Sequence, residues 1–131
     1  MVTSCTTYYI PVNSFREQFA GIDSTKLVEV TVIGPYNGRY RYLANPITII
    51  QCVDKKGNPH KLTNSPSLET RFTYGYKNKK TVFYFDRIYV DSKSVIGIQS
   101  RFIESIGKTI PLDSITKIEI QDGQKNFKYV R

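Results

Sequence analysis

Few residues of this chain have the type and spacing that catalysis requires. The single histidine, His60, lies in the turn-like segment GNPHKL, and nothing nearby in the sequence offers the oriented partner that a general base or a metal ligand needs. No G-x-S-x-G nucleophile elbow and no glycine-rich phosphate loop occurs. One His and two Cys leave few ligands for zinc. We therefore expect a chain that is not an enzyme, with no metal site and no cofactor, in which His60 is an exposed loop residue.

A second candidate chemistry is the binding of a polyanion. The chain has 19 Lys and Arg against 11 Asp and Glu, and a net charge of +8 attracts nucleic acids and other polyanions. Basic and aromatic residues alternate in RYRYL, as in a base-stacking surface beside a basic groove. Strand alternation sends these arginines and tyrosines to opposite faces, which argues against one flat platform. This alternative, a small basic β-barrel that binds nucleic acid, would use Arg39, Arg41, Lys77, Lys79, Lys80, Tyr40, Tyr74 and Tyr76.

The third candidate chemistry is lipidation of Cys5. The residues Val2-Thr3-Ser4 before it follow the order of a bacterial lipobox, in which an aliphatic, a small polar and a small residue precede the modified cysteine. A secretory signal also needs a basic segment and an apolar segment of roughly 7–15 residues. Met1 stands only four residues before Cys5, so lipidation requires a longer precursor. A true start at Met1 would instead predict a cytoplasmic protein.

Cys52 has a different setting from Cys5. It lies in the apolar segment ITIIQCV, where a free cysteine behaves as a small buried hydrophobe. We expect an inert buried thiol. A Cys5–Cys52 disulfide is the alternative in an oxidising compartment, and a lipid on Cys5 would preclude it.

The two ends of the chain resemble those of a known group of proteins. The opening CTTYYIPV and the ending IPLDSITKIEIQDGQKNFKYV, with a short helix and β-rich hairpins between, resemble small uncharacterised lipoproteins of Bacteroidales-type Gram-negative bacteria. The resemblance covers most of the chain through a loose hydrophobic pattern. It implies a cell-envelope address and no known activity. We therefore expect a non-catalytic envelope lipoprotein with a lipid on Cys5, or a binding or structural module, whose protein or glycan partner is unknown. No acidic cluster follows Cys5, and this implies an anchor that faces the periplasm.

The same resemblance implies two glycosylation sites. In such bacteria the O-glycosylation sequon is Asp, then Ser or Thr, then an aliphatic residue or Thr. Asp23-Ser24-Thr25 and Asp113-Ser114-Ile115 match it, which makes Ser24 and Ser114 the acceptors. Each segment also has a plain structural interpretation, as a turn in which the Asp side chain caps nearby backbone N–H groups.

The elements that must position these residues are mainly β. Ile, Val and Thr number 37, whereas Ala and Leu together number 7, a balance that favours strands over helices. Period-two segments separated by turns every eight to twelve residues predict an antiparallel small barrel or sandwich of about nine or ten short strands. The predicted core residues are Val28, Val30, Val32, Ile47, Ile49, Phe72, Phe83, Phe85, Ile96, Ile98, Ile118 and Ile120.

One short helix is expected near the N-terminus. Ser14 and Glu17 have the spacing of a capping box, Phe15 and Phe19 share a face, and Gly21 suits a left-handed C-cap. These signals predict a helix over residues 15–20. An extended arm over residues 1–12 then precedes a single β-rich domain over residues 13–131.

Overall fold

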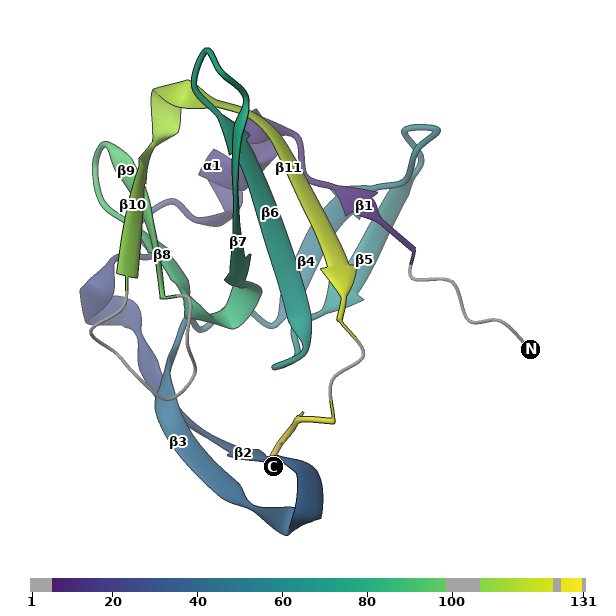
Figure 1. Cartoon of the computed structure of the whole chain (residues 1–131), viewed down its shortest axis with the longest axis vertical. Helices are drawn as coiled ribbons and strands as arrows, with labels where there is room; N and C mark the ends of the chain where they lie inside the picture. The colour runs from purple at the N-terminus through teal and green to yellow at the C-terminus, as the bar shows by residue number, and fades with distance from the viewer. Residues whose placement is uncertain (1–5, 99–106, 124–125, 131) are drawn as a thin grey trace.

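The computed structural model describes residues 6–98, 107–123 and 126–130. The chain is mainly β, with a short α-helix near its N-terminus, as predicted (Figure 1). The described residues form three antiparallel sheets, and no closed barrel is detected among them. Within these ranges no helix has the length and apolar character needed to cross a bilayer.

The largest sheet has six strands in the order β5-β4-β1-β11-β6-β7. The short β1 lies in its interior, paired with β11 on one side and β4 on the other, so the N-terminal segment is built into the sheet. The strand bounds are β1 Tyr8–Tyr9, β4 Ile49–Val53, β5 Pro59–Thr63, β6 Leu68–Tyr74, β7 Lys79–Tyr84 and β11 Ile115–Asp122.

The other described strands form two three-stranded sheets, with the orders β10-β9-β8 and β12-β2-β3. The β2–β3 hairpin lies at one end of the long axis of the molecule, and the β6–β7 turn lies at the other end (Figure 1). The bounds are β2 Val28–Ile33, β3 Arg39–Ala44, β8 Ile88–Val90, β9 Ser94–Ile98, β10 Gly107–Pro111 and β12 Lys128–Tyr129. Within the described ranges, four single-turn 3₁₀ helices connect the longer elements: η1 Ser24–Lys26, η2 Pro35–Asn37, η3 Phe85–Arg87 and η4 Leu112–Ser114.

Helix α1 spans Val12–Gln18 and begins three residues earlier than predicted. The predicted capping box is wrong, because Pro11 is the N-cap and no side chain caps the helix. The predicted apolar face is present: the rings of Phe15 and Phe19 stack at 4.4 Å and are both buried. Gly21 adopts the predicted left-handed conformation, with a φ of 78°, but the predicted cap position is wrong, because the C-cap is Phe19, two residues earlier.

The main core lies between α1, the six-stranded sheet and the β8–β10 sheet. Five predicted core residues, Phe72, Phe83, Phe85, Ile118 and Ile120, are buried there. Val32 is buried as predicted, in a smaller cluster with Tyr42 and Ala44.

Several other core predictions are wrong. Ile49 is 48% exposed and Val28 is 45% exposed, because β4 turns Ile50 and Cys52 inward and β2 runs out of the core at its start. Val30, Ile47, Ile96 and Ile98 are only partly buried. In β9 the inward positions belong to Val95 and Gly97.

Candidate functional site: the open edge at strand β5

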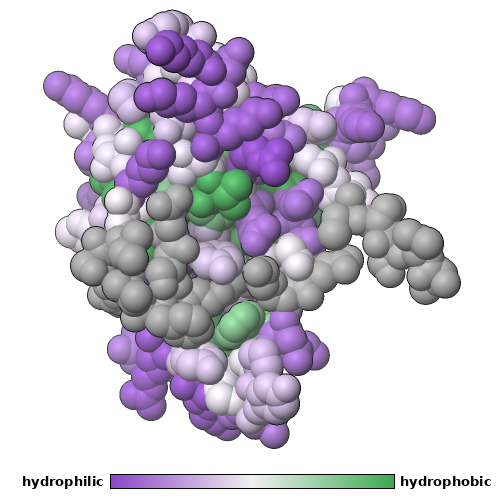
Figure 2. All heavy atoms as spheres, in the orientation of Figure 1, coloured by the Kyte–Doolittle hydropathy of each residue, from purple (hydrophilic) through white to green (hydrophobic). Residues whose placement is uncertain are grey.

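The β4–β5 hairpin carries the most exposed strand of the large sheet. Its turn is organised by Asp54, whose Oδ1 accepts hydrogen bonds from the backbone N–H groups of Lys56 (2.8 Å) and Asn58 (3.0 Å). Gly57, with a φ of 85°, provides the left-handed residue that the turn requires. The hairpin projects from the body, and its tip is hydrophilic (Figures 1 and 2). A short sequence, DKKGN, therefore fixes the start of β5.

The residue pairs at the two ends of this hairpin show which of its pairs are hydrogen-bonded across the two strands. Asp54 N–H donates to the Asn58 carbonyl, and Asn64 N–H donates to the Thr48 carbonyl. Antiparallel pairs alternate between bonded and non-bonded. The main-chain groups of His60 and Leu62 therefore point toward β4. Those of Pro59, Lys61 and Thr63 point away from the sheet, where β5 has no neighbouring strand.

On the opposite side of β4, a side chain satisfies main-chain groups that have no neighbouring strand. β1 is too short to cover Gln51, and the side chain of Gln18 from α1 takes its place. Gln18 Nε2 donates to the Gln51 carbonyl, and Gln51 N–H donates to Gln18 Oε1, both at 2.9 Å. One amide side chain thus substitutes for a strand on that side. No comparable cover lies over the outward groups of Lys61 and Thr63 among the described residues.

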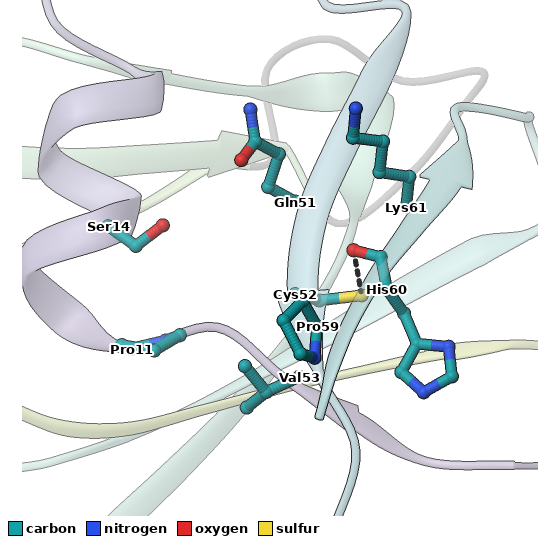
Figure 3. A pocket seen from close by; sticks show the side chains of 8 residues that line it. All are labelled: Pro11, Ser14, Gln51, Cys52, Val53, Pro59, His60 and Lys61. Atoms are coloured by element: carbon teal, nitrogen blue, oxygen red, sulfur yellow. Dashed lines mark hydrogen bonds between the residues drawn. The ribbon is translucent and has the colours of Figure 1, made fainter. Parts of the chain in front are cut away.

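A hollow of about 430 Å³ lies beside this open edge. Figure 3 shows Pro11 and Ser14 on the α1 side of the hollow, facing β4, with His60 and Lys61 of β5 beyond it. The remaining lining comes from Gln51, Cys52, Val53 and Pro59. The hollow therefore offers polar and apolar surface together, directly next to unpaired main-chain groups.

His60 is exposed, as predicted, but it lies in strand β5, and the expectation that it has no partner is wrong. Its Nε2 lies 2.9 Å from Asp54 Oδ2, and its ring contacts the Tyr8 ring with centroids 5.0 Å apart. The bond with His60, followed by the backbone bond from Asn58, holds the pKa of Asp54 well below its ordinary value. The pair stabilises the turn, because both Asp54 oxygens are already engaged within the hairpin.

Cys52 is free and buried, as predicted. Its Sγ lies 3.6 Å from the His60 backbone carbonyl, and that contact involves the main chain rather than the imidazole ring (Figure 3). Burial raises the pKa of the thiol. Cys52 therefore lacks the lowered pKa and the adjacent base that a nucleophilic cysteine needs. In the described ranges, no three His, Cys, Asp or Glu side chains are grouped to hold a metal ion.

The predicted polyanion-binding residues fall into two separate groups. Arg39 and Arg41 are exposed on β3, at the lower end of the long axis in Figure 1. Lys77, Lys79 and Lys80 are exposed around the β6–β7 turn, at the opposite end. Both ends are hydrophilic in Figure 2. The structure therefore does not bring the five cations onto one face.

The predicted stacking tyrosines are also dispersed. Tyr76 is 92% exposed at the β6–β7 turn, and the ammonium group of Lys77 lies 5.6 Å from its ring centroid. Tyr74 is half-buried, and its hydroxyl lies 3.0 Å from Thr81 Oγ1. Tyr40 is half-buried against Phe127, on the strand face opposite Arg39 and Arg41. The predicted separation of arginines and tyrosines in RYRYL is confirmed.

The predicted modification sites are distributed as follows. Cys5 lies outside the described residues. Ser24 is exposed in η1, where Asp23 accepts a hydrogen bond from the Thr25 backbone N–H at 2.9 Å. Ser114 is half-buried in η4, and its hydroxyl donates to the Pro111 carbonyl at 2.7 Å. The capping role expected for an Asp in such a turn is present at Asp23.

Sequence reasoning missed a buried polar cluster around η3. Asp86 accepts hydrogen bonds from the hydroxyls of Tyr42 and Tyr129, the latter at 2.8 Å. Arg87 donates to the Leu43 carbonyl at 2.7 Å, and its guanidinium lies over the Tyr42 ring. Both charged residues are buried. The cluster fastens β3 and β12 to the body, and the signal for it was an Asp-Arg pair inside the apolar run VFYFDRIYV.

Comparison with known proteins adds no relative. The chain matches no protein-family model, and comparisons with curated proteins and with solved structures find no match.

Proposed function

We propose that this chain is a non-catalytic binding module of the cell envelope, held at a membrane by lipid on Cys5. The observation that carries the proposal is the placement of β1. Thr6 is exposed, Tyr8 and Tyr9 then pair with β11, and Tyr9 also pairs with β4. A tether attached at Cys5 would therefore pass directly into the interior of the largest sheet, and the domain would stay close to the surface that holds it.

The side chains whose types could serve catalysis support a binding role instead, because each has a structural task. Asp54 and His60 are used to build a turn, and Cys52 is a buried thiol of raised pKa. Asp86 accepts hydrogen bonds from two tyrosine hydroxyls in the interior. The edge of β5 and its adjoining hollow, by contrast, are available to a partner.

Lipid labelling tests the envelope proposal. The gene is expressed with its natural upstream sequence in a Gram-negative host fed an alkyne-bearing fatty acid, and membrane fractions are probed for label. We expect label on the wild type and on Cys52→Ala, and none on Cys5→Ala. More than one acyl chain gives stable anchoring, so the labelled protein should stay with membranes through a salt wash. Absence of label, or label that persists in Cys5→Ala, would refute the anchor.

A further inference from the structure

We propose that the open edge of β5 is a docking site for an extended, acidic segment of another protein, which adds to the large sheet as a seventh strand. The inference specifies the partner of the binding module proposed above and rests on that proposal, although not on its lipid anchor. Strand addition uses main-chain hydrogen bonds for affinity and neighbouring pockets for side-chain selection.

The main-chain groups on this edge define where a strand could bind. Lys61 and Thr63 each direct an N–H and a C=O outward, whereas Pro59 offers only a carbonyl. An added strand can therefore make two complete pairs, opposite Lys61 and Thr63, and its ladder weakens at Pro59. Five residues of β5 span about 16 Å, so the docking segment needs about five residues.

The hollow beside the edge provides the second requirement. Lys61 belongs both to the open edge and to the hollow's lining, so the two features are continuous. Alternate side chains of an added strand point to the same face. One set of the partner's side chains would thus approach the surface formed by Pro59, Val53 and Pro11 (Figure 3).

The charge around the edge selects an acidic partner. Lys55, Lys56 and Lys61 are exposed on the turn and on β5. In the described part of the chain, none of these ammonium groups forms an ion pair. The carboxylate of the hairpin, Asp54, is engaged by the turn and by His60. The same charges oppose a second copy of this chain, because antiparallel pairing of two β5 strands would bring lysines together.

The test uses a labelled nine-residue peptide that alternates Glu with Val and Thr, and a matched peptide with Lys in place of Glu. Binding is followed by fluorescence anisotropy, and amide exchange is followed by NMR. We expect the acidic peptide to bind, with slowed exchange at the Lys61 and Thr63 amides. Binding with exchange unchanged at both amides would overturn the proposal.

N-methylation separates strand addition from simple charge attraction. Two acidic peptides of equal charge are methylated on alternate amides, one set in each register. We expect one set to weaken binding by at least about tenfold, equivalent to roughly 1.4 kcal/mol, and the other to change it little. Equal binding of the two sets would overturn the proposal.

Protein variants localise the edge. Thr63→Pro removes an outward donor without breaking a bond to β4, and Lys61→Glu reverses a charge. Both should weaken acidic-peptide binding at least about tenfold, whereas Lys79→Glu at the far turn, which matches Lys61→Glu in charge change, should not. Thermal melting verifies that each variant folds. If Thr63→Pro melts early, Lys61→Glu decides the result.

Two other occupants of the edge can be recognised with the same Lys61→Glu variant. Sedimentation that shows a dimer disrupted by Lys61→Glu would assign the edge to a second copy of the chain. Binding to vesicles with anionic phospholipid, lost in Lys61→Glu while the acidic peptide fails to bind, would assign it to a membrane. Either result overturns strand addition. Lipid labelling of Cys5 is measured separately, so failure of the peptide test leaves the anchor proposal intact.

Discussion

Strands β5 and β7 form the two edges of the same sheet, and they differ in what they bury. On β7, Thr81 and Phe83 are buried, and the Phe83 ring lies against β9 at Gly97. On β5 no residue is fully buried, and only Leu62 is partly covered. One edge is therefore part of the core, whereas the other is held mainly by its turn and its single neighbour. The comparison teaches that one edge of the sheet contributes to the stability of the core, whereas the opposite edge leaves its main chain open.

The largest contrast should come from truncating one apolar side chain on each edge. Phe83→Ala should lower the free energy of unfolding by about 3–5 kcal/mol, because it leaves a cavity in the core. Leu62→Ala on β5 should lower it by about 1–2 kcal/mol, since that side chain is partly exposed. Urea denaturation measures both. Equal losses would contradict the assignment of the core to the β7 edge.

Adding a side chain at Gly97 tests the same contrast by overpacking the core beside β7. A Cβ at Gly97 would lie 2.4 Å from the Phe83 ring, whereas at Gly107 the nearest contact is 3.4 Å away. Gly97→Ala should destabilise the fold by about 1–3 kcal/mol through overpacking. The matched control Gly107→Ala should change stability by less than about 0.5 kcal/mol. The double variant Gly97→Ala/Phe83→Leu should recover part of the loss, and strict additivity would show that the two sites are not in contact.

The β5 hairpin should show its own pH dependence through Asp54. Its pKa is lowered in the folded protein, so the stabilising contribution is complete above the ordinary Asp pKa, near 3.9, and is lost as pH falls toward the folded value. Asp54→Asn should melt earlier than the wild type at pH 7. The difference in melting temperature should narrow as the pH falls below about 4. A difference that stays constant down to pH 2 would exclude the carboxylate as its source.

Cys52 reports on how often the β4–β5 hairpin opens. In a Cys5→Ser background, we expect the folded protein to react with a thiol reagent far more slowly than the denatured protein, because the thiol is buried and its pKa is raised. Leu62→Ala, which removes the β5 side chain that packs on the core, should accelerate the reaction more than Phe83→Leu if the hairpin opens locally. Equal acceleration would indicate that Cys52 is exposed only by global unfolding.

The smallest expected effect concerns the three tyrosines that the sequence predicted as a stacking surface. Because the basic groups lie at opposite ends, a single-stranded oligonucleotide should bind weakly and with a steep salt dependence. Tyr40→Ala, Tyr74→Ala and Tyr76→Ala should leave that affinity unchanged. A loss above about 1 kcal/mol in any one of them would instead support a stacking site.

The sequence was informative where its patterns were unambiguous. Alternation in RYRYL gave the correct faces of β3, and Phe15 with Phe19 gave the buried face of the helix. ITII, by contrast, has apolar residues on both faces, so its inward set was settled by α1 and β1 rather than by periodicity. At Gly97 the inward position carries no side chain, and the apolar surface there comes from Phe83 on another strand.

The candidate site was the least accessible to sequence reasoning. GNPHKL has the composition of a turn, whereas the structure places Pro59–Thr63 in strand β5. The contact of Asp54 with His60 depends on the hairpin that joins them, and the spacing of six residues across DKKGNP was the available signal. The replacement of a strand by the Gln18 side chain has no signature in the sequence, because it depends on how α1 lies against β4.

The interior position of β1 also constrains how this chain can fold. β1 pairs with β4 on one side and with β11 on the other, and its Tyr8 pairs with Ile120, 112 positions later. The pairing with β11 therefore cannot form until that residue is present. Contacts at such separation raise the contact order and slow folding, since a long loop must close before they form. While a chain is being synthesised, β4, β5, β6 and β7 can pair with their hairpin partners, but the gap between β4 and β6 stays open. The sheet becomes continuous only when β11 reaches β1 in its middle, so the native sheet cannot form until the chain has been synthesised at least as far as Asp122.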